Sequence, residues 1–536
     1  MLRSFLLTVM LGSLVSPLCV DAQGYFSGDV AANASFYQRD TIIQTNTTQY
    51  LHELSSAEGW LFLNYEREGF RASARFDYYH NSPLIDPQRA FTAGGLGFYQ
   101  LFKRIGHFEV TAGHFYDQIG SGAIFRAFEE RLIGQDYAVH GLRLAYYSPN
   151  GHWAFKAFSG RQRQFSDQSS ITSYRLRPQV VQGLNAEYQS YGDGWAWTPG
   201  LGVVKRTLDK ETMAQLVHTI NALPYEQRFI PRYNVFAFAA YQTLQWKQWS
   251  FYSEADYKTP DVSYSPFRDS MFLSPGYSFY QTIAYAGSHI GLTLQARKTY
   301  QMEIRSSPFD QLLEGLLVFQ PPLAKEHSYR LVARYSVSTV LAGEEGVQAE
   351  FSYSPTTKDY FLLNTSYVRM PDHTPLYQEV YFHYKHKFNT KVKAIAGVQY
   401  RRYNQRVYEI KPGVPMVTTL VPFTDWNIRL DAYRSIKVEA QYLRSAQDYG
   451  DFAYGLIEWN QRRWGLSLGV SDMYNLKPLK TAEPVHYYSV YAFYRKGPLR
   501  TGVEYARQIG GVVCSGGVCR VEPSFRGLKF SFAANF

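Results

Sequence analysis

The sequence predicts an all-β fold: a single large transmembrane antiparallel β-barrel of about 26 strands, with short periplasmic turns and longer external loops. Three observations predict it. The chain opens with a secretory signal, it closes on a strand that ends in an aromatic residue, and apolar and polar residues alternate along much of its length. In a membrane barrel, strands of about 10 residues present one face to lipid and the other to the lumen.

The first 22 residues are typical of a cleaved signal peptide. Arg3 supplies a positive charge, Phe5 to Val15 form an apolar run, and Val20-Asp21-Ala22 offers a cleavage site before Gln23. The run is too short to cross a bilayer, which takes about 20 residues. We therefore expect a signal peptide at 1–22, export to the outer membrane of a Gram-negative cell, and a barrel at 23–536. A buried N-terminal helix is the alternative.

The last nine residues, Leu528 to Phe536, alternate as one strand. Even positions are Leu, Phe, Phe, Ala and Phe, and odd positions are Lys, Ser, Ala and Asn. A period of two separates these sets onto opposite faces of a strand. The terminal Phe536 is similar to the signal that outer-membrane barrels present to their assembly machinery, which we expect as a partner. The alternative is an edge strand of a soluble β-sandwich. It is disfavoured because another part of the protein would have to cover the apolar face of this strand.

Similar alternation recurs along the chain, at 70–78, 329–335, 347–353 and 436–442. A soluble sheet would show the same pattern, so the signal peptide, the terminal Phe and the large number of alternating segments together decide for a membrane barrel. Tight turns rich in Gly, Pro, Asn and Asp separate the strands. They lie at 67–69, 104–106, 149–151, 192–194, 247–248, 287–288, 321–324, 356–358, 389–390, 434–435, 462–463 and 496–497.

The number of strands follows from these turns. About twelve periplasmic turns, with both chain ends also periplasmic, give about 26 strands. This count requires a strand at 313–320, and without it the barrel has about 24 strands. Longer stretches between the tight turns would form the external loops.

Composition narrows the function classes. Aromatic residues make up 17% of the chain, and the formal net charge is +10. The basic residues are scattered singly, which argues against a nucleic-acid surface. After the signal, no run of 18 apolar residues occurs, so we expect no transmembrane helix. Tryptophans flank two turns, at 246 and 249 and at 459 and 464, as in an interfacial belt or in ordinary cross-strand packing.

A charged stretch at 117–136 interrupts the strand pattern. Gly120 and Gly122 break the strand, and a short helix is expected at 124–133. The four charged residues within 124–133 cannot face lipid. We interpret the stretch as a loop folded into the lumen as a constriction or plug, paired with basic residues of the wall. A solvated external loop is the alternative. The candidate residues are Arg126, Glu129, Glu130 and Arg131 in the loop and Arg71, Arg75 and Arg143 in the wall.

Two further segments are expected in external loops. Residues 209–222 predict a helix, with Asp209 as its cap and Met213, Leu216, Val217 and Ile220 on one face. This helix either covers its own strands, acts as a lid or contacts a partner. Cys514 and Cys519 flank a glycine turn, and in an exported protein they favour a disulfide at an exposed loop tip.

Enzyme motifs are absent from the sequence. It contains no G-x-S-x-G, H-E-x-x-H or phosphate-binding loop, and no metal-ligand set of Cys and His. We therefore expect no catalytic activity, no cofactor and no metal. His114 and His140, near the charged stretch, are the only histidines that merit attention.

Two blocks of residues resemble an uncharacterised family of Bacteroidota outer-membrane proteins. The first block is Gly120-Ser121-Gly122, Phe125-Arg126, Glu129-Glu130-Arg131 and Gly141-Leu142-Arg143. The second is Lys325 to Tyr329 with Gly343-Glu344 and Gln348, where Val347 departs from an expected Phe. The resemblance spans most of the mature chain. It implies an outer-membrane barrel of unknown function, and it implies no reaction and no ligand.

Two functions fit these features. The first is a porin-like channel for small polar or anionic solutes, because basic residues outnumber acids at inward positions. These basic residues are Arg71, Arg75, Arg330, Arg334, Lys391, Lys393, Arg401, Lys437 and Lys529. The alternative is a non-conducting scaffold subunit of an outer-membrane assembly or secretion complex, with protein partners. Outer-membrane lipid surrounds the barrel in both, and no nucleic acid is expected.

Overall fold

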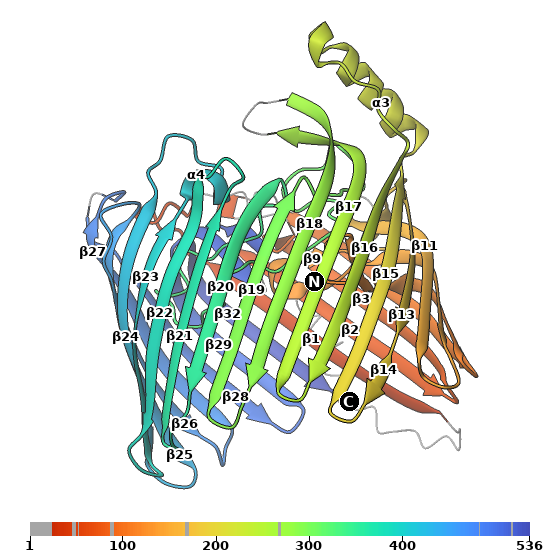
Figure 1. Ribbon diagram of the computed structural model, residues 1–536. Helices are drawn as coiled ribbons and strands as arrows, with labels where there is room; N and C mark the ends of the chain where they lie inside the picture. Colours follow the sequence, from red (N-terminus) through yellow and green to blue (C-terminus); the bar gives the residue numbers. More distant parts are fainter. Residues whose placement is uncertain are drawn as a thin grey trace.

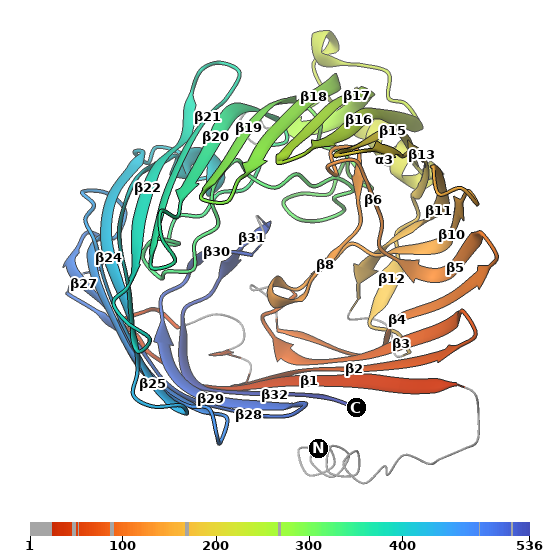
Figure 2. The same ribbon diagram turned by 60° about the horizontal axis from the view of Figure 1, so that its bottom comes forward.

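The computed structural model describes residues 24–45, 50–51, 53–85, 90–166, 171–265, 270–481, 483–515 and 518–536. The expected signal peptide at 1–22 lies outside the described residues. Almost every described element is a β-strand, and the long strands form one closed antiparallel ring (Figures 1 and 2). The predicted fold class, an all-β antiparallel barrel, is confirmed.

Twenty-four strands form the ring within the described part of the chain, and each pairs with its neighbours in the order of the sequence. They are β1 Tyr25–Tyr37, β2 Ser55–Arg67, β3 Phe70–Ser82, β4 Phe91–Ile105, β5 Phe108–Phe115, β10 Val139–Tyr147, β11 Trp153–Phe165, β13 Val180–Tyr188, β15 Trp195–Thr207, β16 Asn234–Trp246, β17 Trp249–Ser265, β18 Ser270–Ala286, β19 Ile290–Tyr300, β20 Gly343–Tyr353, β21 Asp359–Arg369, β22 Pro375–Lys387, β23 Val392–Tyr403, β24 Val417–Arg429, β25 Arg434–Leu443, β26 Gly450–Gln461, β27 Leu466–Pro478, β28 His486–Lys496, β29 Leu499–Gln508 and β32 Phe525–Asn535.

The first and last strands close the ring. β1 pairs with β32 over the register from Asp29 opposite Asn535 to Tyr37 opposite Gly527. Gly28 and Phe536 exchange two backbone hydrogen bonds of 2.9 Å. Closure leaves no strand edge in the ring, as a sheet in lipid requires, because hydrocarbon cannot satisfy free backbone groups.

The ring has the lower of the two expected strand numbers because β19 pairs directly with β20, Tyr300 opposite Gly343. The chain between them, 301–342, leaves the wall and enters the interior. The strands expected at 313–320 and 329–335 and the turn expected at 321–324 are therefore wrong. The other tight turns all fall at or near hairpin ends. Two short strands, β12 Tyr174–Leu176 and β14 Ser190–Gly192, extend the sheet beyond the ring.

The outer face of the ring is apolar. Alternate side chains point outward, among them Leu201 and Phe279, which are 65% and 59% exposed. Trp246 and Trp249 face each other across a tight turn at the end of the ring where β1 begins. A large apolar surface of this kind is rare on soluble monomers and is typical of the outer face of membrane barrels. No described helix has the length and apolar character needed to cross a bilayer.

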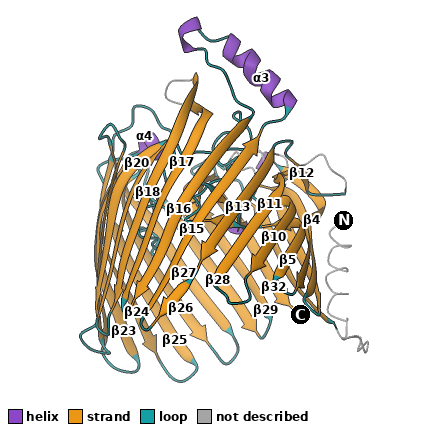
Figure 3. Ribbon diagram, turned by 45° about the vertical axis from the view of Figure 1, so that its right-hand side comes forward, coloured by secondary structure: helices purple, strands orange, loops and turns teal. Residues whose placement is uncertain are grey.

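Longer loops and the helices lie at the opposite end (Figures 1 and 3). Helix α3, Lys210–Asn221, begins after Asp209, whose side chain accepts hydrogen bonds from the N–H groups of Glu211 and Thr212. Met213, Leu216 and Ile220 of α3 are buried with Val262 of β17, as the pattern at 209–222 predicted. Val217, expected on the same face, is exposed. The loops also hold η3 Tyr225–Gln227 and α4 Gln405–Tyr408.

Phe536 provides a test of barrel assembly. Phe536→Ala keeps both backbone hydrogen bonds to Gly28 but removes a ring that is 60% exposed. We expect this substitution to lower the membrane-inserted fraction severalfold, measured as the heat-modifiable band on electrophoresis. Phe530→Ala, which removes another exposed ring from β32, is the matched control and should insert normally. Equal insertion of both variants would show that the terminal ring is not read during assembly.

Candidate functional site in the barrel interior

The stretch 117–136, between β5 and β10, folds into the ring (Figure 2). It contains β6 Gln118–Ile119, β7 Phe125–Arg126, β8 Glu129–Glu130, the single turn η2 Arg131–Ile133 and β9 Gln135–Asp136. The short helix expected at 124–133 is therefore reduced to η2. β6 pairs with β7 and β8 with β9, so two short hairpin pairings stand where a helix was expected.

Glycines allow this stretch to lie close to the wall. Gly120 has a positive φ of 56°, and a Cβ there would lie 2.3 Å from the Glu254 carboxylate of β17. The next residue, Ser121, donates its backbone N–H to both oxygens of Glu254, at 3.2 and 2.9 Å. A side chain at position 120 would push the loop off its acceptor, so glycine is required for the attachment.

A buried ion-pair cluster binds the same stretch to β3 and β11. Arg75, whose side chain is 1% exposed, contacts Asp77 and Glu129 at 2.6 Å and Asp136 at 3.2 Å. Arg163 contacts Asp77 at 3.3 Å and also pairs with Asp136. Two wall cations are thus shared by one wall acid and two loop acids. Removal of one member of such a cluster leaves a buried charge without its partner.

Asp136 depends on these arginines for its charge. Burial alone would raise its pKa, but Arg163, Arg75 and the Ala138 N–H hold the pKa below the ordinary value. A depressed pKa in the folded state contributes stability above the unfolded pKa of about 3.9. That contribution is lost as the pH falls through the folded pKa, so the loop is held most firmly at neutral pH.

Of the other candidate residues, all but Arg71 lie in the stretch 117–136 or contact it. Arg131 contacts Glu129 at 3.0 Å and lies over the Phe62 ring, and Arg143 contacts Asp117 at 2.6 Å. Arg126 stacks on Phe128 and Phe319 at 4.8 and 4.7 Å from the ring centroids, and Glu130 is half-buried. Arg71 does not reach the loop, because it pairs with Glu66 near the adjacent turn, 3.4 Å away.

The second interior segment is 301–342, which the sequence pattern had suggested as wall. It contacts strands from β20 to β25. Lys325 contacts Glu350 of β20 at 2.7 Å, and Tyr335 donates its hydroxyl to Asp448, after β25, at 2.8 Å. The backbone N–H of Leu331 donates to Gln441 of β25 at 2.8 Å. Inward polar side chains thus hold the segment along one side of the interior.

Glu379 of β22 is at the centre of this attachment. It contacts His327 at 2.8 Å and Arg401 of β23 at 3.3 Å, and the Glu379 side chain is fully buried. Arg401 also donates to the Val332 carbonyl at 2.5 Å. Burial lowers the pKa of His327 despite the adjacent carboxylate. The imidazole is therefore neutral at pH 7 and joins Glu379 by a hydrogen bond.

The two interior segments bind each other. The Arg126 N–H donates to Leu317 O at 2.9 Å, and the Phe319 N–H donates to Gly122 O at 3.1 Å. The Phe128 and Phe319 rings lie 5.0 Å apart. We call residues 117–136 and 301–342 together the inner assembly.

The available sequence signal for the second segment was a cluster of basic residues, Arg330 and Arg334 within the strand expected at 329–335 and His327 just before it.

A third element, the hairpin of β30 Gly511–Ser515 and β31 Val518–Glu522, also points into the ring (Figure 2). It was expected as an exposed loop tip, but its Arg520 donates to the Leu84 carbonyl and contacts Glu522 at 2.8 Å. The register places Cys514 opposite Cys519. The side chains of these two cysteines lie outside the described residues, so the disulfide stays a prediction.

His114 and His140 form part of an aromatic cluster. Their rings lie 4.9 Å apart, and the Tyr99 hydroxyl is 2.5 Å from His140 Nε2. His114 is fully buried against the Tyr174 ring. Across the described residues, no group of three or more His, Cys, Asp or Glu side chains is placed to hold a metal ion.

A family of unknown function, DUF6029, matches residues 1–536. The chain belongs to this family. No curated protein matches the DUF6029 chain.

Several solved outer-membrane structures are similar to the DUF6029 chain. The P pilus usher (PapC) translocation pore has a TM-score of 0.45 at 10% identity, covering 95% of this chain and 99% of the usher. The outer-membrane transporter YddB from Escherichia coli has a TM-score of 0.41 at 7% identity, covering 95% and 81%. The ferric enterobactin receptor PfeA from Pseudomonas aeruginosa has a TM-score of 0.41 at 10% identity, covering 95% and 80%.

Arg75 tests the attachment of the inner assembly. Arg75→Ala leaves Asp77 and Asp136 buried with one cation fewer, so we expect a loss of about 3–5 kcal/mol in the free energy of unfolding. Urea unfolding in detergent micelles measures it. Arg71→Ala removes an exposed pair on the same strand and should cost about 0–1 kcal/mol. Similar losses in the two variants would contradict the buried cluster as the anchor.

Proposed function

We propose that the protein is an outer-membrane channel for small polar solutes, narrowed and gated by the inner assembly. The observation that carries the proposal is that 301–342 leaves the wall and is held in the interior by side chains of the wall. A segment of this kind reduces the space through which a solute could pass. No cofactor and no catalytic step belongs to the proposal.

The proposed location rests on the barrel itself. The apolar outer belt and the even number of strands are features of bacterial outer-membrane barrels, as are short turns at one end and long loops at the other. The signal peptide at 1–22, insertion by the barrel assembly machinery and a Bacteroidota origin stay predictions. The short turns would then face the periplasm, and α3 would face the exterior.

The charges of the interior favour polar solutes without a strong preference for anions. Several basic residues expected to make the lumen positive have acidic partners. Arg75 and Arg401 are buried in ion pairs, and Lys437 contacts Glu439 at 3.0 Å and Asp425 at 3.7 Å. Paired charges produce a weaker field at the pore axis than free ones do. We therefore expect the channel to select solutes by size more than by charge.

Removal of the interior segment tests the channel. Gln301 and Met302 donate backbone N–H groups to Ala342 and Leu341, at 3.1 and 3.0 Å, so the ends of the segment are adjacent. Residues 303–340 can be replaced by an Asn-Gly turn while β19 and β20 stay paired. We expect a severalfold increase in single-channel conductance in planar bilayers, because the deletion opens the interior.

A matched deletion controls for the loss of a loop. Leu208 donates its N–H to Tyr233 O at 2.9 Å, so the external residues 209–232 can be replaced in the same way. This variant should conduct like the intact protein. Equal conductance of the intact protein and the inner deletion would contradict gating, and no current from either would contradict a channel.

A non-conducting scaffold is the second candidate function, and the loop that carries α3 favours it. Tyr225 and Ile230, which follow α3, are 82% and 85% exposed. Exposed apolar side chains beyond the membrane belt are available to a protein partner. We expect a scaffold to co-purify with a partner from gently solubilised membranes and a Tyr225→Ser, Ile230→Ser variant to lose it. If no partner co-purifies with either the intact protein or the variant, the scaffold function is contradicted.

A further inference from the structure

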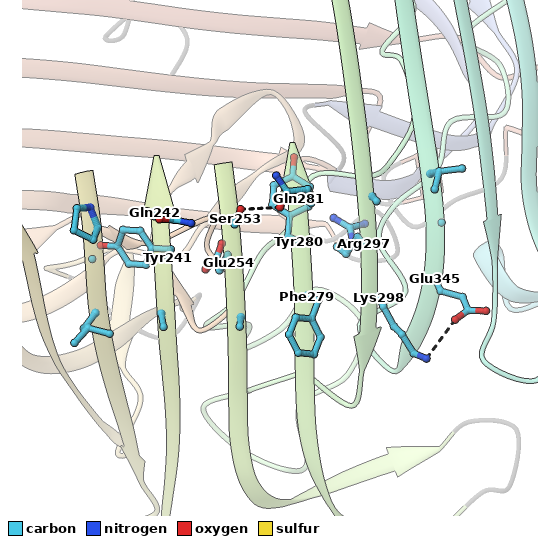
Figure 4. A pocket seen from close by; sticks show the side chains of 18 of the residues that line it. Tyr241, Gln242, Ser253, Glu254, Phe279, Tyr280, Gln281, Arg297, Lys298 and Glu345 are labelled. Atoms are coloured by element: carbon cyan, nitrogen blue, oxygen red, sulfur yellow. Dashed lines mark hydrogen bonds and ion pairs between the residues drawn. The ribbon is translucent and has the colours of Figure 1, made fainter. Parts of the chain in front are cut away.

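A groove of about 1200 Å³ runs along the outside of the wall, from β11 to β21 (Figure 4). Its lining is mainly outward-facing: Leu201, Phe279 and Val347 are exposed, whereas the adjacent Tyr241 and Arg297 are buried toward the interior. The groove is therefore separate from the interior site, and it opens onto the lipid.

Small side chains create the groove. Ala240 of β16 lies opposite Ala255 of β17, and Ala296 of β19 occupies the same kind of outward position farther along. Leu201 and Phe279 flank the two paired alanines on the neighbouring strands. Alanine between large apolar residues leaves a hollow in the lipid-facing surface, and hydrocarbon fills such a hollow favourably.

One end of the groove is charged. Lys298, Glu345 and Arg369 face outward at the ends of β19, β20 and β21 nearest the external loops. Glu345 lies 3.6 Å from the Lys298 ammonium and 2.7 Å from the Arg369 guanidinium, so two cations share one anion. A charge on the lipid face costs about 2–4 kcal/mol at the bilayer midplane and about 0–1 near the interface. These residues therefore lie at headgroup level.

Lys298 has unused hydrogen-bonding capacity. Its side chain is 55% exposed, and its ammonium donates no hydrogen bond to the described part of the chain. Two other polar side chains on the same surface, Ser253 and Gln281, are joined by a hydrogen bond of 2.7 Å (Figure 4). The charged end thus offers the hydrogen-bond donors of Lys298 and Arg369 and one excess positive charge, at the level of the headgroups of the external leaflet.

We propose that this groove binds one lipid of the external leaflet whose headgroup carries an anionic phosphomonoester. The phosphate contacts Lys298 and Arg369, and hydrocarbon lies along the floor formed by Ala240, Ala255 and Ala296. The two cations around Glu345, at the charged end of the groove, favour an anionic headgroup over an apolar partner helix.

Native mass spectrometry of the full chain tests this proposal. The detergent-solubilised barrel is mixed with monophosphoryl lipid A or with phosphatidylcholine at equal concentration. We expect one monophosphoryl lipid A per barrel, retained at about tenfold lower concentration than phosphatidylcholine. The Lys298→Gln, Arg369→Gln double variant should lose this preference. Equal retention of both lipids by the intact protein would overturn the proposal.

Two further variants test whether the lipid binds in the groove itself. Arg402→Gln removes another outward basic residue at the same end of the ring, outside the groove, and should retain the lipid. Ala255→Trp fills the floor without changing a charge and should release it. Retention by the filled variant would overturn the groove as the site. Heat-modifiable migration of every variant shows that its barrel is folded.

Alternative occupants give different results. Displacement of the lipid by an equal concentration of inorganic phosphate would assign the charged end to a soluble anion and overturn the lipid proposal. A dimer that the Ala255→Trp variant abolishes would assign the groove to a second copy and overturn it too. The proposal rests on the membrane location in the proposed function, but it is independent of conduction. A barrel that binds the lipid and carries no current therefore contradicts only the channel.

Discussion

Closure of the sheet between β1 and β32 is the constraint on which the rest of the structure depends. A free strand edge in hydrocarbon would expose a row of unpaired N–H and carbonyl groups, each costing several kcal/mol. The register from Asp29–Asn535 to Tyr37–Gly527, continued by Gly28 and Phe536, removes that edge. Once the ring is closed, alternate side chains must point inward, and the interior becomes the place where charge can be buried.

The interior shows how such charge is stabilised. Wall cations and acids pair with side chains of 117–136 and 301–342 at several heights around the ring, as at Arg75, Glu379 and Glu350. These contacts attach chain segments that have no regular pairing of their own with the ring strands. The barrel wall therefore specifies the position of the inner assembly through side chains, while it holds itself together through its backbone.

Much of the fold could be predicted from the sequence, because an apolar outer face and a polar interior impose a period of two along each strand. The terminal strand at 528–536, the hairpin turns and the helix capped by Asp209 follow from such local rules. The segment 301–342 could not be placed in this way. Residues 329–335 alternate like a wall strand, and the segment is held inward by partners far away in the sequence, such as Asp448 and Gln441.

The adjacent ends of 301–342 also bear on how the molecule folds. Because Met302 and Leu341 are hydrogen-bonded neighbours, β19 and β20 form a hairpin that carries a loop of about 40 residues in place of a short turn. Closing the longer loop costs only about 2 kcal/mol more in chain entropy. One or two contacts with the wall offset that cost. The chain entropy of this loop therefore does not prevent the ring from closing before the segment docks.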